Sequence, residues 1–335
     1  MVSVHYVELT QLCRDAVLRA GADDGAAKIL AEATVEAERV GNPAVGVAHL
    51  FDYLDAYRDG RIAKDSRPVV RRAAPAVVDV DAGGGLAQSA FVAALDQLAV
   101  ATRECGVAAL WIRNSFTCGE LGYYPRRIAQ LGFIALAAAN SPALMSLGGA
   151  PGSVLGTNPL AYGVPRPGML PVVIDQASSS TAFVNVRRAA ESGEAIPAGW
   201  ALGPDGRQTQ DAGAALLGTL LPFGGHRGGN VALLVEILAT LSGASFSPDA
   251  APFDTGTSSP GIGVFGLCVD ATAIFPGSVE RLASQLQTLR ENHQVRLPAL
   301  ELTAMPDTVE ISAATLERLR GAAAADPRPD STSRG

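Results

Sequence analysis

The chain has 335 residues, of which 48% are hydrophobic and 18% are charged, and its formal net charge is -7. This length and composition predict a globular protein with a large core and two or three subdomains. No basic stripe is visible, which argues against nucleic acid as a partner. The most apolar run, residues 132–155, is interrupted by Asn140, Pro142 and Pro151, so it does not predict a membrane span.

The four cysteines, Cys13, Cys105, Cys118 and Cys268, are scattered and form no CxxC pair. This spacing predicts neither a zinc site nor a disulfide framework. The first residues lack a basic region followed by an apolar core, so no signal peptide is expected. We expect a soluble, cytoplasmic protein from a reducing compartment.

Apolar periodicity and turn residues divide the chain into elements. Helices are predicted twice within residues 7–40 and then over 47–59, from the glycine turn 81–85 to 104, and over 231–242, 278–292 and 313–324. Strands are predicted at 69–70, 76–80, 107–112, 133–138, 172–175 and 266–269. Residues 197–230 are expected to be turns and glycine.

This order places helices at both ends of the chain and strands in the middle, which predicts an α/β fold. Residues 1–75 and 278–324 are expected to share one helical, dimer-forming layer. Residues 76–277 are expected to form the cofactor-binding and catalytic sheet domain, with a loop-rich insertion. The tail at 325–335 is expected to be disordered because it is rich in Pro, Asp, Ser and Arg.

Two glycine-rich segments match patterns that occur in nucleotide-binding sites, and only the second of them remains a candidate. Residues 261–266 match GxGxxG, but a polar turn precedes them and a strand-like run follows, so we reject a Rossmann fingerprint. Residues 223–230 carry Arg227 into the start of an apolar helix. This arrangement suits a bound anion or, alternatively, a flexible surface loop. Similarly, Asp175 is either a strand-end cap or a ligand of a ribose hydroxyl.

Several segments together resemble the type 2 malate/L-lactate dehydrogenase family, which includes cyclic-imine (piperideine and pyrroline carboxylate) reductases. The resemblance covers about residues 5 to 320 in order and spacing. Its pieces are Gly85-Leu86-Ala87-Gln88, Arg113-Asn114-Ser115, Gly122-Tyr123-Tyr124, Asn140-Ser141-Pro142, Gly148-Gly149, Leu155 to Ala161, Ile174 to Ser179, Ile196 to Trp200, Gly225-His226-Arg227-Gly228 and Leu297 to Glu301.

The resemblance implies a non-Rossmann NAD(P)-binding fold with a mostly antiparallel central sheet flanked by helices. It also implies a homodimer with its active site between subunits, a small-molecule substrate, and NADPH or NADH as cofactor. The residues implied to bind the cofactor are Ser141, Thr157, Asn158, Asp175, Gln176, Ala177, His226 and Arg227. Arg227 stands where the family usually has lysine. For a 2′-phosphate, Arg187 and Arg188 are candidates only because they follow the Asp175 strand, and a solvated basic face is the favoured interpretation of them.

The catalytic part departs from the family. Ala44 and Val45 stand where the family has a serine and a histidine, and His49 stands at its arginine position. Thr117 replaces a second histidine, with Cys118 beside it. The resemblance therefore implies that both usual catalytic histidines are missing, together with the arginine thought to hold a substrate carboxylate.

These departures limit the chemistry. Reducing a ketone leaves an alkoxide that needs a proton, which a histidine with its usual pKa near ~6.5 supplies well. The candidate catalytic residues are His49 (if its side chain reaches the pocket), Thr117 as a relay, and Cys118. Val45, Phe116 and Tyr124 are candidates for lining the substrate pocket.

An iminium substrate needs no strong acid, because hydride neutralises it. The sequence therefore predicts an NAD(P)H-dependent reductase of an unusual C=N or C=O substrate, in a specialised biosynthetic pathway. The alternative is the same fold used for a non-redox step, such as cyclisation or elimination, or as an inactive binding protein.

Overall fold

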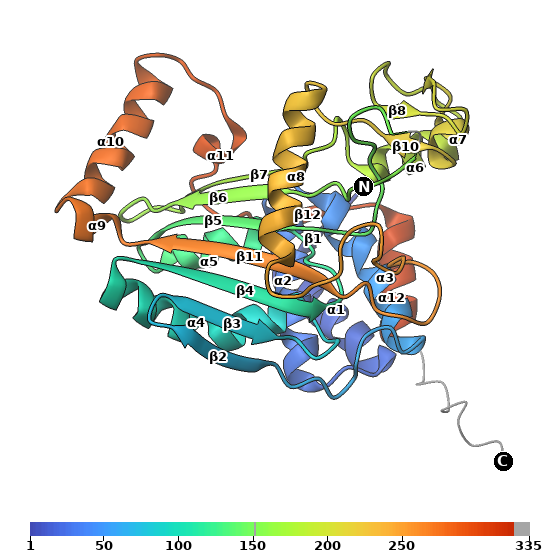
Figure 1. The fold of residues 1–335 in the computed structure, drawn as a ribbon. Coiled ribbons are helices and arrows are strands. Elements are labelled where there is room, and N and C mark those ends of the chain that lie inside the picture. The colour runs from blue at the N-terminus through green and yellow to red at the C-terminus, as the bar shows by residue number, and fades with distance from the viewer. Residues whose placement is uncertain (151, 325–335) are drawn as a thin grey trace.

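The computed structural model describes residues 1–150 and 152–324 (Figure 1). The predicted disordered tail, residues 325–335, lies outside these described residues. Among the helices of the described part, none is both long and apolar enough to cross a membrane.

Seven strands form the central sheet, in the order β2-β3-β4-β11-β5-β6-β7. Neighbouring strands are antiparallel except β3 and β4, which run parallel. The mostly antiparallel central sheet expected from the sequence is therefore confirmed. The strands are β2 Val69–Ala74, β3 Val77–Asp81, β4 Val107–Ser115, β5 Ile134–Ala139, β6 Leu160–Val164, β7 Val172–Gln176 and β11 Ile262–Val269.

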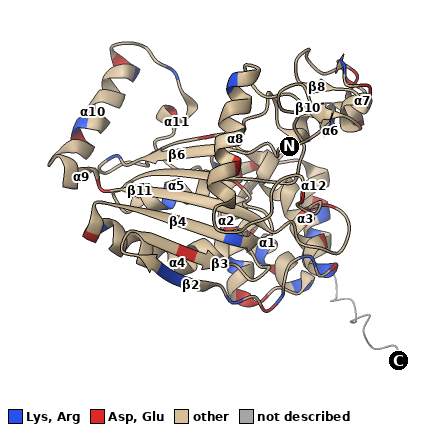
Figure 2. Cartoon of the chain, in the orientation of Figure 1, with Lys and Arg blue, Asp and Glu red and all other residues tan. Residues whose placement is uncertain are grey.

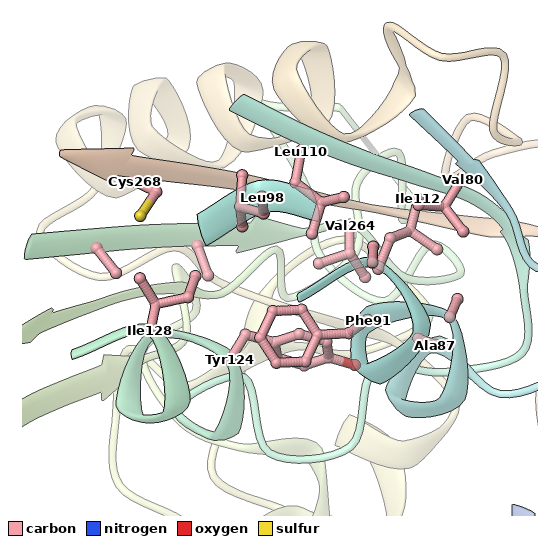
Figure 3. Close-up of a cluster of buried hydrophobic side chains, with 14 of the residues drawn as sticks. Val80, Ala87, Phe91, Leu98, Leu110, Ile112, Tyr124, Ile128, Val264 and Cys268 are labelled. Atoms are coloured by element: carbon pink, nitrogen blue, oxygen red, sulfur yellow. The ribbon is translucent and has the colours of Figure 1, made fainter. Parts of the chain in front are cut away.

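Side chains alternate between the two faces of the sheet along each strand. Both faces are apolar because the central strands carry apolar residues at both sets of positions. Leu110, Ile112 and Val264 point into the main core beneath α4 and α5, which Figure 3 shows in close-up. Trp111 and Phe265 point to the opposite face, which α8 covers in part. The three helices are α4 Ala87–Cys105, α5 Tyr123–Gln130 and α8 His226–Thr240.

The segment that matches GxGxxG is part of the central strand β11, so the rejection of a Rossmann fingerprint agrees with the structure. Gly263 has a packing role there. A Cβ at this position would lie 2.0 Å from the Ala239 carbonyl oxygen of α8. Only glycine therefore lets α8 approach the sheet this closely.

The two ends of the chain meet in one helical layer. Strand β1 pairs with β12 in antiparallel fashion, and α1 packs against α2, α3 and α12. Figure 1 shows these elements together on one side of the sheet. They are β1 Val2–His5, α1 Tyr6–Ala20, α2 Asp24–Arg39, α3 Val47–Arg58, β12 Thr308–Ile311 and α12 Ala313–Ala324.

Part of the range 278–324 lies outside this layer, which differs from the expectation. Helix α10 (Ser278–Glu291) packs against α9 (Ala271–Ile274) and stands at the far end of the sheet in Figure 1. Helix α11 (Pro298–Glu301) contacts β7. Helical periodicity predicted α10 itself, but it gives no information on the element that a helix packs against.

The loop-rich insertion contains a second small core. Three two-residue strands form a sheet in the order β10-β8-β9, and α6 packs against α7 beside it. Residues 197–230 were expected to be turns and glycine, but they contain β8, β9, α7 and β10, and α8 begins at His226 rather than at 231. The elements are α6 Phe183–Ser192, β8 Ala201–Leu202, β9 Gln208–Thr209, α7 Ala212–Leu216 and β10 Thr219–Leu220.

Candidate functional site

The loop after β4, residues 116–122, is held in place by hydrogen bonds from side chains on α4 and α5. Gln88 on α4 donates from Nε2 to the Cys118 carbonyl at 3.1 Å, and the Tyr124 hydroxyl donates to the same carbonyl at 3.0 Å. Gly119 has a φ of +64°, which favours glycine at this turn. The loop backbone is thus fixed, and Thr117 faces the helical layer.

Helix α3 carries His49 to Thr117. His49 Nε2 lies 3.4 Å from Thr117 Oγ1, and His49 Nδ1 lies 2.7 Å from Asp52 Oδ2. The Thr117 hydroxyl also contacts Tyr53 Oη at 2.6 Å. The rings of Tyr53 and Phe253 stand edge-on to the imidazole, with centroids 5.0 and 5.9 Å away. His49 is therefore within reach of the Thr117 hydroxyl.

Cys118 is a poorer proton donor than His49. Its thiol is buried and donates to the Gly119 carbonyl oxygen. Burial raises the pKa of this thiol to about 12, and the nearby Asp175 carboxylate adds to the shift. Such a thiol releases its proton too reluctantly to serve as the acid at neutral pH.

The three residues expected to line the substrate pocket occupy different places. Phe116 is fully buried and packs edge-on against Tyr53, with ring centroids 5.3 Å apart. Tyr124 is buried in the main core beside Phe91 (Figure 3). Of the three, Val45 alone lines a cavity, which is large enough for about one water molecule. Gln88 also lines it, and its buried Oε1 has no partner among the described residues.

Asp175 connects the loop to the end of β7. Its Oδ2 accepts the Gly122 backbone N–H at 2.8 Å. Burial raises the pKa of Asp175 to about 6, and repulsion from Glu120 adds to this. Glu120 is itself buried and pairs with Arg126 at 2.6 Å. The Asp175 carboxyl group, which is bonded to the loop after β4, therefore changes its protonation state at about pH 6.

The residues implied to bind the cofactor gather at one end of β5, β6 and β7. The Ser178 N–H donates to the Thr157 carbonyl at 2.8 Å, and the Phe223 N–H donates to the Ser178 carbonyl at 3.0 Å. These bonds join the glycine-rich loop to the strand ends. His226 and Arg227 are exposed on the first turn of α8.

Two observations on this region fit a bound NAD(P). The buried Asn158 Oδ1 has no partner among the described residues, whereas its Nδ2 donates to Glu236 and to the Ala232 carbonyl. A Cβ on Gly156 would lie 2.5 Å from that Oδ1 and 2.3 Å from Ser141 Oγ, so glycine keeps this polar recess open. An amide or hydroxyl of the cofactor can satisfy the free acceptor.

The cations of this region differ in their availability. Arg227 has no ion-pair or hydrogen-bond partner within the described part of the chain, so it is free for a phosphate. Arg187 lies 3.9 Å from Asp254, and Arg188 donates to Asn185 at 2.7 Å.

Sequence reasoning missed Asp52, Tyr53 and Gln88. A usable signal existed for the first two, because Asp52 and Tyr53 follow His49 by three and four residues and so share its helix face. Gln88 is distant in sequence, and only the packing of α4 brings it to the loop.

Comparison with known proteins shows the family of this chain. A family model described as malate/L-lactate dehydrogenase matches residues 4–304. A (2R)-3-sulfolactate dehydrogenase (NADP(+)) of Chromohalobacter salexigens is 34% identical over 88% of this chain and 90% of its own. A Delta(1)-pyrroline-2-carboxylate/Delta(1)-piperideine-2-carboxylate reductase of Pseudomonas syringae pv. tomato is 36% identical over 95% of each chain.

Solved structures show the same fold. The crystal structure of delta1-piperideine-2-carboxylate reductase from Pseudomonas syringae superposes with a TM-score of 0.87 and 34% identity, covering 96% of this chain and 100% of the other. A dehydrogenase from Sinorhizobium meliloti gives a TM-score of 0.86 at 28% identity, covering 96% of this chain and 99% of the other.

Proposed function

Because this chain belongs to the malate/L-lactate dehydrogenase family and is an NAD(P)-dependent oxidoreductase, we propose that it reduces the C=N bond of a cyclic imine with NADPH or NADH. The observation that carries the proposal is the contact between His49 and Thr117, at 3.4 Å, on the loop that Asp175 joins to the cofactor-binding end of the sheet. His49 and Thr117 form one weakly acidic donor pair. This pair suits an imine, because an imine needs little acid catalysis.

The cofactor supplies a hydride when it is bound. Arg227 and the first turn of α8 are positioned to hold a phosphate, because free N–H groups and the helix dipole favour an anion there. Asn158 and Ser141 provide polar atoms in the recess kept open by Gly156. The preference between NADPH and NADH depends on Arg227, the unpaired cation of this region.

The substrate class follows from the charges around Thr117. Arg126 is committed to Glu120 and Glu36, at 2.6 and 2.7 Å. His49 already pairs with Asp52. With no unpaired guanidinium beside Thr117 among the described residues, an anionic carboxylate next to the C=N bond gains little there. A cationic iminium, in contrast, is favoured by the carboxylates of Asp52 and Asp175.

The test is a panel of cyclic imines with and without the carboxylate, each offered with NADPH and with NADH. We expect loss of reduced-nicotinamide absorbance with at least one imine, and a higher kcat/KM for imines without the carboxylate. Cofactor binding with no turnover on any imine or ketone would point instead to a non-redox role. No binding of either cofactor would exclude the proposal.

We further propose a cytoplasmic homodimer in which α8, which lies outside the layer of residues 1–75 and 278–324 expected to form the dimer, contributes part of the interface. The helix is apolar around its circumference, and Figure 2 shows few charged residues along it. Helices of this kind are normally buried. A second copy fits because a two-fold contact pairs a surface with itself. The exposed side chains on α8 and just after it are Leu233 (43%), Leu234 (51%), Ile237 (50%) and Leu241 (63%).

Light scattering after size exclusion tests the dimer. Leu234→Glu with Ile237→Glu should give a monomer, whereas Val69→Glu, which changes an exposed residue on the edge strand β2, should leave the oligomer unchanged. A monomeric wild-type protein at micromolar concentration contradicts the dimer without affecting the reductase proposal.

A further inference from the structure

Four side chains form a continuous polar chain between α3 and the loop after β4. Asp52 contacts His49, His49 contacts Thr117, and Thr117 contacts Tyr53, at 2.7, 3.4 and 2.6 Å. Tyr53 Oη in turn accepts a hydrogen bond from Gln88 Nε2 at 3.1 Å and donates to the Thr117 carbonyl at 3.2 Å. We propose that Asp52 and Tyr53 are positioning residues for a proton relay that runs from His49 through the Thr117 hydroxyl to the substrate. This inference rests on the proposed reductase function.

Asp52 determines which ring nitrogen of His49 faces the loop. An ionised carboxylate only accepts hydrogen bonds, so the nitrogen that contacts it, Nδ1, carries a hydrogen. The other nitrogen, Nε2, is thereby left for Thr117. It donates when the ring is an imidazolium and accepts when the ring is neutral. Asp52 thus keeps Nε2 as the nitrogen that exchanges the proton.

Tyr53 fixes the oxygen of Thr117 without being an acid itself. Burial raises the pKa of Tyr53 well above its usual range, so its hydroxyl stays neutral. Its single hydrogen is directed to the Thr117 carbonyl, so Oη accepts from Thr117 Oγ1. With that bond made, Oγ1 receives a hydrogen only from the imidazolium form of His49. His49 and Thr117 therefore form a donor pair in which the imidazolium Nε2–H points to Thr117 Oγ1.

The proton balance closes within these groups. The Thr117 hydroxyl turns its hydrogen from Tyr53 Oη to the carbonyl oxygen or neutral imine nitrogen of the substrate and passes it there, while the imidazolium Nε2–H passes its proton to Thr117 Oγ1. For an imine, this transfer forms the iminium that accepts the hydride. The hydride supplied by the bound cofactor provides the electron pair for the carbon. His49 is left neutral and regains a proton from solvent, to which its side chain is 16% exposed.

The surroundings of His49 are mostly neutral apart from Asp52. Tyr53 shares its helix, and Cys118 lies in the loop with its thiol protonated. Phe253 packs edge-on to the ring, and Arg61 donates to the Phe253 carbonyl while pairing with Asp59. Asp52 is the carboxylate in contact with the imidazole, so its removal should dominate any change in the pH dependence.

The first test compares Asp52→Asn with Asp55→Asn. Asp55 lies on the same helix but pairs with Arg58 and does not contact His49. We expect Asp52→Asn to lower kcat by about 10²-fold, the lower end of what general acid catalysis supplies, because the substrate needs little of it, and to move the basic limb of the pH profile to lower pH. Asp55→Asn should change neither. An unchanged pH profile in Asp52→Asn overturns the proposal.

A readout independent of turnover separates this inference from the reductase proposal. In protein with isotope-labelled histidine, NMR at alkaline pH should show His49 with its hydrogen on Nδ1, the signal being identified by its loss in His49→Gln. Asp52→Asn should shift the hydrogen toward Nε2, and Asp55→Asn should not. If no imine is turned over but this tautomer change appears, the reductase proposal fails and the arrangement of the relay stands. If the tautomer is unchanged, the relay fails.

The second test addresses Tyr53 and Thr117. Tyr53→Phe should lower kcat with little change in KM, whereas Tyr57→Phe, one turn further along α3, should leave both unchanged. Thr117→Ser should retain most of the activity and Thr117→Val should lose it, because only the hydroxyl takes part. Equal activity of the Ser and Val variants contradicts a relay through Thr117.

Discussion

Gly122 donates its backbone N–H to Asp175 Oδ2 at 2.8 Å, which joins the loop after β4 to the end of β7. The two segments are 53 residues apart in sequence. Through this bond, the loop that carries Thr117 is held against the strand ends where the cofactor-binding residues gather. The proposed proton donor and the proposed cofactor site are thereby fixed relative to one another.

Asp175→Asn should change stability in a pH-dependent way. Burial raises the pKa of Asp175 from 3.8 to about 6, so folding favours its protonated form. The stability that this provides is complete below about pH 4 and is lost as the pH rises through about 6. The asparagine variant, whose amide oxygen still accepts from Gly122, should gain on the order of 1 kcal/mol over wild type at about pH 8 and nothing at about pH 4.

Urea unfolding at both pH values measures this gain. Asp205→Asn, which alters an exposed turn carboxylate, serves as the control and should show the same difference from wild type at both. A gain for Asp175→Asn that does not vary with pH would contradict the buried-carboxylate explanation.

Gly156→Ala should weaken cofactor binding. The added Cβ would lie 2.6 Å from the Ser141 backbone oxygen and fill the recess beside Asn158. We expect the Kd for NADPH, measured by quenching of tryptophan fluorescence, to rise about tenfold or more, which corresponds to about 1.4 kcal/mol. Gly152→Ala, with no atom within 4 Å of the added Cβ, should bind normally. Equal Kd values for the two variants would show that the recess beside Asn158 takes no part in cofactor binding.

Arg126→Met should destabilise the fold strongly. The guanidinium is buried between Glu120 and Glu36, and its loss leaves the buried Glu120 without its charge partner. Breaking such a pair costs about 3–5 kcal/mol. The exposed pair between Arg58 and Asp55 is the reference, and Arg58→Met should cost less than about 1 kcal/mol. Chemical denaturation of the two variants compares them directly.

Gly263→Ala and Gly266→Ala form a matched pair on the same strand. At Gly263 the added Cβ would meet the Ala239 carbonyl at 2.0 Å, whereas at Gly266 the nearest atom is a Leu110 side-chain carbon at 3.5 Å. We expect Gly263→Ala to lower Tm markedly or to prevent folding, because α8 must move away from the sheet. Gly266→Ala should behave nearly as wild type in the same thermal scan.

The sequence predicted the positions of helices and strands better than it predicted which elements they pack against. A continuous apolar run predicted a buried strand at 107–112, and the structure extends it to Ser115. The helix at 278–292 was also predicted, but its packing against α9 was not. Periodicity reports which face of an element is apolar, whereas the neighbour depends on contacts between distant segments.

The candidate site shows the same division. The family resemblance drew attention to Thr117 and His49, and their contact at 3.4 Å required the packing of α3 against the loop. Tyr53 was not among the candidate residues, and Gln88 entered only as the end of the segment Gly85 to Gln88 that carries the resemblance. Their hydroxyl and amide acquire a role only where two helices bring them to one backbone loop.

The pairing of β1 with β12 joins segments at distant positions in the sequence, Val2–His5 and Thr308–Ile311. The layer of α1, α2 and α3 therefore lacks this strand partner until residues 308–311 have been synthesised. His49 and Tyr53 belong to this layer. All strands of the central sheet precede β12 in the chain, so the sheet can pair on the ribosome before the elements that carry the proposed proton donor gain this strand.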